Sequence, residues 1–206
     1  MTFTVGCMRA LIIVDVQPDF CPGGALATAR GTDVAEAIAT AVESHGGTYA
    51  AIVTTQDWHI DPGPHFSPTP DYVDSWPVHC QAGTPGAELH PALLRVADMI
   101  SARFHKGLYS AAYSGFEGRQ AGTPPEILTP DEEDTRMDLA AWLHSRGVTA
   151  VDVCGIATDF CVKATALDAV RAGLETRLLR ELCSPVAAES EATALEEMAA
   201  AGITLV

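Results

Sequence analysis

The sequence has few basic residues and no long apolar stretch. Only 12 Lys and Arg stand against 27 Asp and Glu in 206 residues, so the formal net charge is −15. A field of this sign repels phosphate backbones, which argues against a nucleic-acid partner. No apolar run approaches the roughly 20 residues that span a bilayer, and the start of the chain lacks the features of a secretion signal. We therefore expect a cytoplasmic protein that acts on a small molecule, with no membrane partner.

Paired cysteines are also absent, because none of the six forms a C-x-x-C motif. Their spacing fits neither a zinc knuckle nor a small disulfide scaffold. In a reducing compartment most should be buried thiols. They are Cys7, Cys21, Cys80, Cys154, Cys161 and Cys183. The chain also has no G-x-G-x-x-G after its first predicted strand, which disfavours a dinucleotide-binding protein.

Short β-branched runs alternate with longer amphipathic stretches along the chain. Continuous apolar runs such as "RALIIVDV" are typical of strands buried on both faces. The predicted strands cover 9–16, 49–56, 98–104, 149–156, 175–182 and 203–206. The predicted helices cover 33–47, 129–147, 157–173 and 188–202. This alternation predicts an α/β protein with one parallel sheet and helices on both faces, forming a single domain over residues 1–206.

Two passages lack regular periodicity. Residues 57–97 are rich in Pro and Gly, and a loop of that length inside a compact domain is usually functional or disordered. Residues 119–138 are acidic and contain prolines, and we expect an excursion there that serves as a lid edge or an oligomer contact. At its end, Thr129 and Glu132 match a capping box, Pro130 suits the first helical position, and Gly147 would end the predicted helix.

Chemically capable side chains gather at the predicted carboxyl ends of the strands, where parallel sheets bind ligands. Asp15 ends the first strand, Lys106 follows the third, and Cys161 lies near the start of the helix after the fourth. A helix start favours a thiolate, an adjacent carboxylate can take its proton, and a lysine offsets their repulsion. Taken one at a time, each also has an ordinary interpretation as a buried thiol, a turn aspartate or a solvated lysine.

The stretch "TQDWHIDPGPHF" raises the possibility of a metal site. Asp57, His59 and His65, together with His79 further along, offer one carboxylate and up to three imidazoles. Such a set suits Fe(II), Mn(II) or Zn(II) and leaves positions open for water or substrate. Because Asp, His, Gly and Pro are ordinary loop residues, a polar surface loop is the alternative.

Five segments resemble the signature segments of the nicotinamidase/pyrazinamidase family, in the family's order. They are "ALIIVDVQPDF", "DWHIDPGPHFSPTPDY", "SWPVHCQAGTPGAELHP", "FHKGLYSAAYSGFEG" and "GIATDFCVKATALDAVRAGL". The resemblance covers nearly the whole chain and is closest in kind to the actinobacterial members. It implies the isochorismatase-like hydrolase fold, a three-layer α/β/α arrangement around a six-stranded, mainly parallel sheet. Five ordered motifs make a chance similarity implausible.

The resemblance also implies roles for individual residues. Asp15, Lys106 and Cys161 would form the catalytic triad, with an oxyanion hole from the backbone N–H groups of Ala157 and Cys161. One divalent metal ion (Fe, Mn or Zn) would be held by Asp57, His59 and His79, with His65 a ligand or near-ligand. The Ile156–Ala157 peptide would be cis. The substrate contacts would be Phe20 and Trp76, which would sandwich a pyridine ring, together with Tyr113, Ile156 and Ala157.

The implied reaction is hydrolysis of nicotinamide to nicotinate and ammonia, and of pyrazinamide likewise, through a thioester on Cys161. The metal would orient water and bind the ring nitrogen. Two departures from the family pattern stand out, namely Phe160 before the nucleophile and the long acidic segment 119–138. A metal-independent carbamoyl or ureido amidohydrolase, an isochorismatase and a catalytically silent ligand-binding member remain as alternatives. The sequence leaves the oligomeric state open between monomer and homodimer.

Overall fold

The protein is built around a seven-stranded sheet. The computed structural model describes residues 8–122 and 126–206, so Cys7 lies outside the described part of the chain. The strand order is β4-β3-β2-β1-β5-β6-β7, and every neighbouring pair is parallel except β3 and β4. The strands are β1 (Arg9–Val14), β2 (Ala51–Asp57), β3 (Ala102–Lys106), β4 (Arg119–Gln120), β5 (Ala150–Ile156), β6 (Glu175–Ser184) and β7 (Thr204–Leu205).

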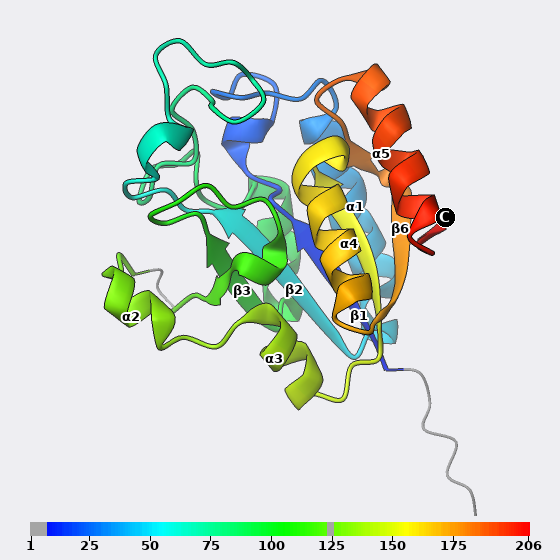
Figure 1. Cartoon of the computed structure of the whole chain (residues 1–206). Helices are drawn as coiled ribbons and strands as arrows, with labels where there is room; N and C mark the ends of the chain where they lie inside the picture. Colours follow the sequence, from blue (N-terminus) through cyan, green and yellow to red (C-terminus); the bar gives the residue numbers. More distant parts are fainter. Residues whose placement is uncertain (1–7, 123–125) are drawn as a thin grey trace, which may run out of the picture.

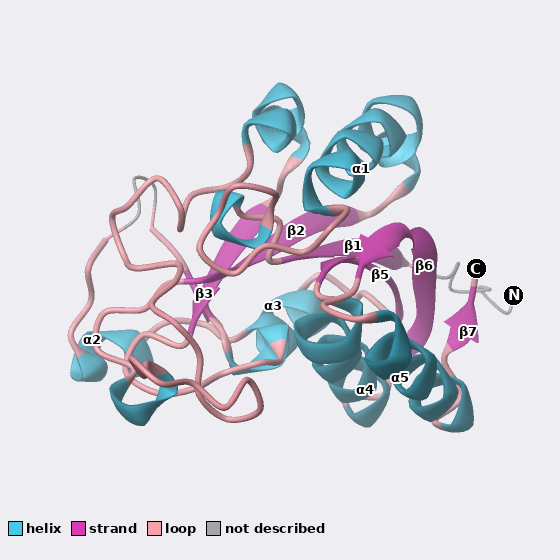
Figure 2. Ribbon diagram, turned by 90° about the horizontal axis from the view of Figure 1, so that it is seen from above, coloured by secondary structure: helices cyan, strands magenta, loops and turns pink. Residues whose placement is uncertain are grey.

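Helices cover both faces of this sheet (Figure 1). They are α1 (Gly31–His45), α2 (Pro130–Asp134), α3 (Leu139–Ser145), α4 (Lys163–Arg171) and α5 (Ala188–Ala200). Seen from above, α1 lies on one face and α3, α4 and α5 lie on the other (Figure 2). The predicted α/β fold with a mainly parallel sheet is therefore confirmed. The sheet has seven strands where six were expected, because the two-residue β4 is too short to leave a periodic signal.

The central strands owe their burial to their continuous apolar sequences. Leu11, Ile12 and Ile13 of β1 are at most 3% exposed, as expected for a strand covered on both faces. On α1, Val34, Ile38 and Val42 lie on one face of the helix, and all three are buried. The core therefore lies along β1 and the neighbouring strands β2 and β5. Close packing there holds the ends of these strands, and the residues that follow them, in fixed positions.

Two predicted elements differ from the structure. The strand predicted over 98–104 begins only at Ala102, because the short helix η4 (Pro91–Met99) occupies the preceding residues. The helix predicted over 129–147 is broken into α2 and α3. Asp138 starts the second helix by accepting a hydrogen bond from the N–H of Ala141 at 2.7 Å. The Met137 carbonyl instead accepts the N–H of Gln120 at 2.9 Å, which draws the chain toward β4.

The irregular segment 57–97 contains the 3-10 helix η3 (Gly63–His65) and most of η4, which continues to Met99, among extended loops. In the segment 119–138, residues 123–125 lie outside the described residues. Its first two residues form the edge strand β4, and Glu132 accepts the N–H of Thr129 at 2.8 Å, as the predicted capping box requires. The segment thus extends the sheet beyond β3, on the edge next to the strands that carry the candidate site.

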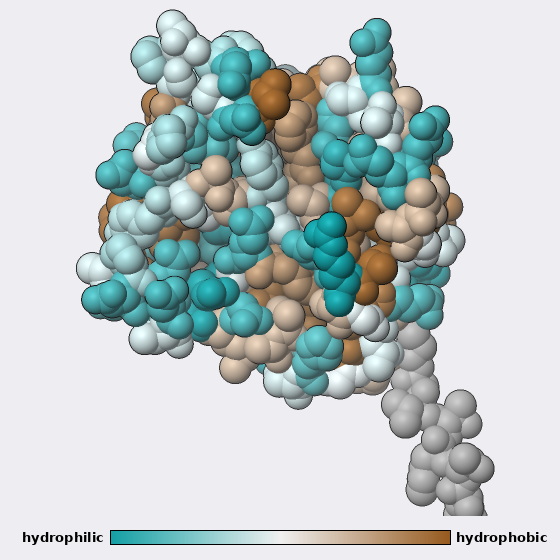
Figure 3. All heavy atoms as spheres, viewed as in Figure 1, coloured by the Kyte–Doolittle hydropathy of each residue, from teal (hydrophilic) through white to brown (hydrophobic). Residues whose placement is uncertain are grey.

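The surface is mixed in character. Figure 3 shows the face of Figure 1 as largely hydrophilic, with hydrophobic side chains in separate patches.

Across residues 8–122 and 126–206 no helix is both long enough and apolar enough to cross a bilayer. The described cysteines (Cys21, Cys80, Cys154, Cys161 and Cys183) are buried free thiols, as predicted.

Candidate active site and metal site

The carboxyl ends of the central strands bring the predicted catalytic residues together. Asp15 follows β1, and the β2–β3 register sets Asp57 opposite Lys106. Both of these residues are the last of their strands, not the first beyond them as the sequence suggested. Cys161 lies in the π-helical turn η6 (Thr158–Val162), which follows β5 and leads into α4. Because β5 and β2 flank β1, these side chains meet at one edge of the sheet.

Lys106 is the centre of this cluster. Its Nζ lies 3.0 Å from Oδ2 of Asp15 and 3.5 Å from Sγ of Cys161, and it contacts Oδ1 of Asp57. It also donates to the carbonyl of Ala112 at 3.0 Å. The side chain is fully buried, so a solvated surface lysine is excluded. A buried ammonium requires such partners, since charge without them is very costly in a protein interior.

Asp15 is held in place by its backbone and by β2. Its φ of 49° is left-handed, which turns the chain sharply out of β1. Its N–H donates to the carbonyl of Thr55 at 3.1 Å, and its Oδ1 accepts the hydroxyl of Thr55 at 2.7 Å. Its other oxygen faces Lys106. Together with Cys161 and Asp57, it forms a group whose oxygen and sulfur atoms all lie within 4.8 Å of one another.

The charges of this cluster shift one another's protonation. Burial raises the pKa of Asp15, although the Lys106 ammonium opposes that shift. Burial also raises the pKa of Cys161, again against the pull of Lys106. Burial lowers the pKa of Lys106, but Asp15 and Asp57 outweigh it and raise that pKa well above its usual range. Lys106 is therefore a permanent cation, and Asp15 is a more basic carboxylate than usual, which suits proton transfer.

The turn that carries Cys161 has the predicted cis peptide between Ile156 and Ala157. Within this turn the carbonyl of Ala157 accepts the N–H groups of Phe160 and Val162 at 3.1 and 3.0 Å. Ala157 and Cys161 both line the same pocket. Their backbone N–H groups, predicted to form an oxyanion hole, thus belong to one compact turn beside the thiol.

Next to this cluster, three buried histidines and Asp57 form a possible metal site. The nearest ring nitrogens of His59, His65 and His79 lie within 4.8 Å of one another. Oδ2 of Asp57 is 3.7 Å from Nε2 of His59 and 3.8 Å from Nε2 of His79. The opposite ring nitrogens of His59 and His79 face carbonyl oxygens of Gly107 and Pro77 at 2.6 and 2.7 Å. These contacts orient both rings with Nε2 toward the carboxylate.

The residues of this site fit a divalent metal ion. Nε2 of His59 and Nδ1 of His65 are buried without a hydrogen-bond partner in the described part of the chain, which is costly unless a ligand binds them. Burial lowers the pKa of His65 to about 4, so its ring is neutral at pH 7, as a ligand must be. One carboxylate and three imidazoles suit Zn, Fe or Mn. The burial of Asp57 and the three histidines excludes the alternative of a polar surface loop.

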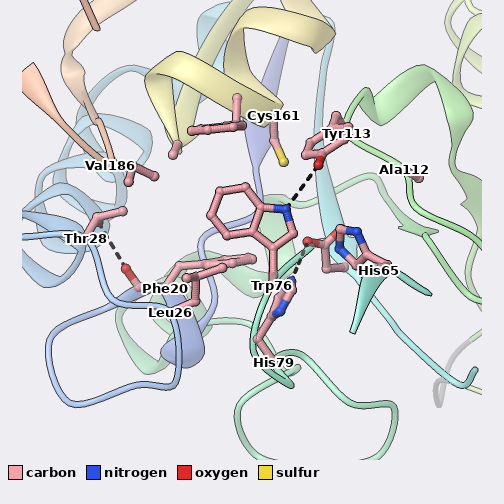
Figure 4. Close-up of a pocket in the computed structure, with 13 residues that line it drawn as sticks. Phe20, Leu26, Thr28, His65, Trp76, His79, Ala112, Tyr113, Cys161 and Val186 are labelled. Atoms are coloured by element: carbon pink, nitrogen blue, oxygen red, sulfur yellow. Dashed lines mark hydrogen bonds and ion pairs between the residues drawn. The ribbon is translucent and has the colours of Figure 1, made fainter. Parts of the chain in front are cut away.

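A pocket opens between the cysteine and the histidines (Figure 4). Trp76 projects into it from the loop after η3, and its Nε1 donates to the hydroxyl of Tyr113 at 3.1 Å. Phe160 packs its ring edge-on against Trp76 at 5.1 Å, so this residue forms part of the wall. The pocket is lined by Phe20, Leu26, Thr28, Asp57, His65, Trp76, His79, Ala112, Tyr113, Ala157, Phe160, Cys161 and Val186.

The sequence located most of this lining, with two kinds of difference. Ile156 was predicted to contact substrate, but it is fully buried and does not line the pocket. Leu26, Thr28, Ala112 and Val186 line the pocket without having been predicted as site residues. Ala112 lies within a family motif and the other three lie outside the motifs, but no charge or spacing marks any of them. Thr55, whose hydroxyl bonds Asp15, was also not predicted as a site residue. Its position opposite Val14 follows only once β1 and β2 are paired.

The fold and the site together define an α/β protein with a buried Cys, Asp and Lys cluster beside a candidate metal site. The Isochorismatase domain family model matches residues 9–206. The chain is 52% identical to the nicotinamidase/pyrazinamidase of Mycobacterium tuberculosis, covering 97% of this chain and 98% of that one. It is 37% identical to the Escherichia coli nicotinamidase, covering 96% and 93%. This chain therefore belongs to the isochorismatase family.

Solved structures agree with this assignment. The pyrazinamidase of Pyrococcus horikoshii in complex with zinc is 36% identical, with a TM-score of 0.76 over 97% of this chain and 98% of that one. PnC1 from L. infantum in complex with nicotinate is 33% identical, with a TM-score of 0.77 over 97% and 92%. Both the fold and the length of this chain therefore match those of the two solved structures.

Proposed function

We propose that this protein is a metal-dependent cysteine amidohydrolase that converts nicotinamide to nicotinate and ammonia, and pyrazinamide to pyrazinoate. The observation that carries the proposal is that Cys161, which is part of the cluster with Asp15 and Lys106, lines one pocket together with three residues of the candidate metal site. These three are Asp57, His65 and His79. The similarity to the nicotinamidase/pyrazinamidase of M. tuberculosis supports the same reaction.

In the first half of the reaction, Asp15 accepts the proton of the Cys161 thiol, and the sulfur attacks the carboxamide carbon. The carbonyl oxygen becomes negative and accepts hydrogen bonds from the N–H groups of Ala157 and Cys161. When the C=O bond re-forms, the C–N bond breaks, and Asp15 returns its proton to the departing nitrogen. Ammonia leaves, and the acyl group remains on Cys161 as a thioester.

In the second half, water attacks the thioester carbon while Asp15 accepts a proton from it. The C–S bond then breaks, the carboxylic acid leaves, and the proton returns to the sulfur of Cys161. Lys106 takes no proton in either half. Its fixed charge, 3.0 Å from Asp15, keeps that carboxylate ionised between steps and stabilises the thiolate at 3.5 Å.

Asp57, His59, His65 and His79 would hold the divalent ion, with Zn, Fe and Mn as the candidates. Bound there, it supplies a Lewis acid that orients water and can accept the lone pair of a pyridine nitrogen. Phe20 and Trp76, both buried and lining the pocket, offer flat apolar surfaces to an aromatic ring. These flat surfaces favour a planar aromatic amide over a flexible carbamoyl substrate.

The test is ammonia release from nicotinamide by the purified protein, with and without prior removal of metal by a chelator. We expect turnover that metal removal abolishes and that added Zn²⁺, Mn²⁺ or Fe²⁺ restores. No release of ammonia would refute the proposal, and turnover unaffected by chelator would favour the metal-independent alternative.

Benzamide adds a test of recognition, because it keeps the shape of nicotinamide but lacks the ring nitrogen. Stacking alone predicts a mild preference, whereas loss of a ring-nitrogen contact also misplaces the carboxamide. We expect kcat/KM for benzamide to be at least ~100-fold lower, or about 3 kcal/mol. Near-equal values for the three amides would exclude recognition of the ring nitrogen.

We also propose that residues 1–206 form one domain and that the protein acts in the cytoplasm on small amides rather than on nucleic acid or membranes. The family match over residues 9–206 supports the single domain. Limited proteolysis and cell fractionation test these two statements, and light scattering decides between monomer and homodimer.

A further inference from the structure

We propose that Gln17 is a positioning residue for Asp57 and, through Asp57, for the metal site. Its side-chain amide makes the backbone hydrogen bonds to Asp57 that a neighbouring strand would otherwise make. The inference rests on the proposed function, since it assigns a role within that site. Gln17 lies in the segment "ALIIVDVQPDF" but was given no role by the sequence, and its side chain is fully buried.

The need for such a residue follows from the unequal lengths of β1 and β2. These strands run side by side (Figure 1), but their pairing ends at Val14 and Thr55. The N–H of Asp15 makes the last bond, to the carbonyl of Thr55 at 3.1 Å, and the chain then turns away. β2 continues for two more residues to Asp57. On the β1 side, the backbone N–H and carbonyl of Asp57 would therefore be left in a buried place without a partner strand.

The amide of Gln17 supplies both missing bonds. Its Oε1 accepts the N–H of Asp57 at 2.9 Å, and its Nε2 donates to the carbonyl of Asp57 at 2.8 Å. The second hydrogen of Nε2 goes to the carbonyl of Ala87, also at 2.8 Å. The side chain thus reproduces on one side of Asp57 the donor and acceptor pair of a neighbouring strand, while Lys106 of β3 lies opposite Asp57 on the other side.

The position of Asp57 matters because its carboxylate serves two partners at once. One oxygen contacts Lys106, and the other lies 3.7 Å from His59 and 3.8 Å from His79. A small rotation of the Asp57 backbone would therefore break either the contact with Lys106 or the approach to the two histidines. By its third bond, to Ala87, Gln17 also ties Asp57 to the segment that follows His79. Groups that hold metal ligands in this way contribute about 10- to 100-fold to metal affinity or activity.

Gln56 offers a matched control. It is also buried at 1% exposure, and its Nε2 donates to the same Ala87 carbonyl at 2.9 Å. Its amide makes no hydrogen bond with Asp57 among the described residues. Replacing each glutamine by methionine keeps the volume and removes the amide. Gln17→Met loses the contacts to Asp57 and Ala87, whereas Gln56→Met loses only the contact to Ala87.

The experiment measures Zn²⁺ dissociation constants of the metal-free proteins by competition with a coloured chelator, then kcat and KM for nicotinamide at saturating Zn²⁺. For Gln17→Met we expect the dissociation constant to rise about 10- to 100-fold and kcat to fall at least ~10-fold. We expect KM to change less than about threefold, because Gln17 does not line the pocket. Gln56→Met should stay within about threefold of the parent protein in Zn²⁺ affinity.

Thermal unfolding of the metal-free proteins separates positioning from general stability. Equal Zn²⁺ affinities for the two variants at equal losses of Tm would overturn the inference, as would an unchanged affinity and kcat in Gln17→Met. If Gln17→Met does not fold, Gln17→Asn takes its place. That variant keeps the amide one carbon short of Asp57 and lets water fill the gap, and the same rise in the dissociation constant is expected. A parent protein that binds none of Zn²⁺, Mn²⁺ and Fe²⁺ would instead refute the metal dependence of the proposed function.

Discussion

Lys106 and Asp57 form a buried ion pair that joins the cysteine cluster to the histidine site. Lys106 contacts one oxygen of Asp57, while the other oxygen of Asp57 faces Nε2 of His59 at 3.7 Å. Burial raises the pKa of Asp57, but Lys106 and then the histidines outweigh it and hold that pKa far below its usual range. One carboxylate thus serves as counter-ion on one side and as metal ligand on the other.

Cys161→Ala should abolish turnover and leave the fold and the metal content intact. Only the thiolate can form the thioester, and the mechanism offers no other nucleophile within reach of the oxyanion hole. We expect kcat below about a thousandth of the parent value, a loss above ~4 kcal/mol of transition-state stabilisation. Single-turnover assays, circular dichroism and elemental analysis measure the turnover, the fold and the metal content. The control is Cys154→Ala, which lies in buried β5 and should lose stability but retain kcat/KM. If the Cys161→Ala protein still hydrolyses nicotinamide at more than about a thousandth of the parent rate, another residue is the nucleophile.

Replacing a histidine of the metal site should remove the metal before it affects the fold. His59→Ala and His79→Ala each lose an imidazole whose Nε2 faces Asp57. We expect the purified variants to retain less than about a tenth of the metal of the parent protein, measured by elemental analysis. His65→Ala tests whether His65 is a ligand or a near-ligand, since a milder loss marks a near-ligand. Full metal content in all three variants would refute the site.

Tyr113→Phe should weaken substrate binding more than chemistry. The hydroxyl of Tyr113 accepts the N–H of Trp76 at 3.1 Å, and Trp76 lines the pocket. Losing that bond costs about 1 kcal/mol, so we expect KM for nicotinamide to rise about fivefold with kcat nearly unchanged. Tyr109→Phe is the matched control, because its hydroxyl bonds the carbonyl of Leu128 and it does not line this pocket. An equal effect of both substitutions would exclude a specific role for the Trp76 contact.

Asp152→Asn should change how stability depends on pH without changing catalysis. Burial raises the pKa of Asp152, but hydrogen bonds from Arg177, Tyr49 and Arg9 outweigh it and lower that pKa below the ordinary value of 3.8. A lowered carboxyl pKa stabilises the folded state above pH 3.8, and that stability is lost as the pH falls through the folded value.

Urea unfolding at pH 7 and at pH 3 measures this effect. Asp152→Asn should lose about 2 kcal/mol at pH 7 and show a smaller fall in the free energy of unfolding between the two pH values than the parent protein. Its kcat/KM at pH 7 should be unchanged, because Asp152 lies near the start of β5, away from Cys161. An unaltered pH dependence would exclude this ion cluster as a source of acid sensitivity.

The order of strands and helices, and most of the site, could be derived from the sequence. Continuous apolar runs such as Leu11–Val14 identify buried strands because only a two-sided burial tolerates them. The rule that ligands bind at the carboxyl ends of parallel strands then predicts Asp15, Lys106 and Cys161 at one edge of the sheet. The family motifs added the metal ligands, and the burial of His59, His65 and His79 agrees with them.

Only the tertiary structure decided the features that depend on contacts between distant segments. The break between α2 and α3 arises because Met137 bonds Gln120 of β4, a pairing that no local propensity encodes. The exclusion of Ile156 from the pocket and the inclusion of Val186 depend on how β5 and the loop before α5 pack. Gln17 shows the same principle most clearly. It stands in the segment "ALIIVDVQPDF", but the sequence does not show which groups its amide bonds. Its role arises only because β2 extends past the end of β1, which leaves the buried backbone of Asp57 without a partner strand.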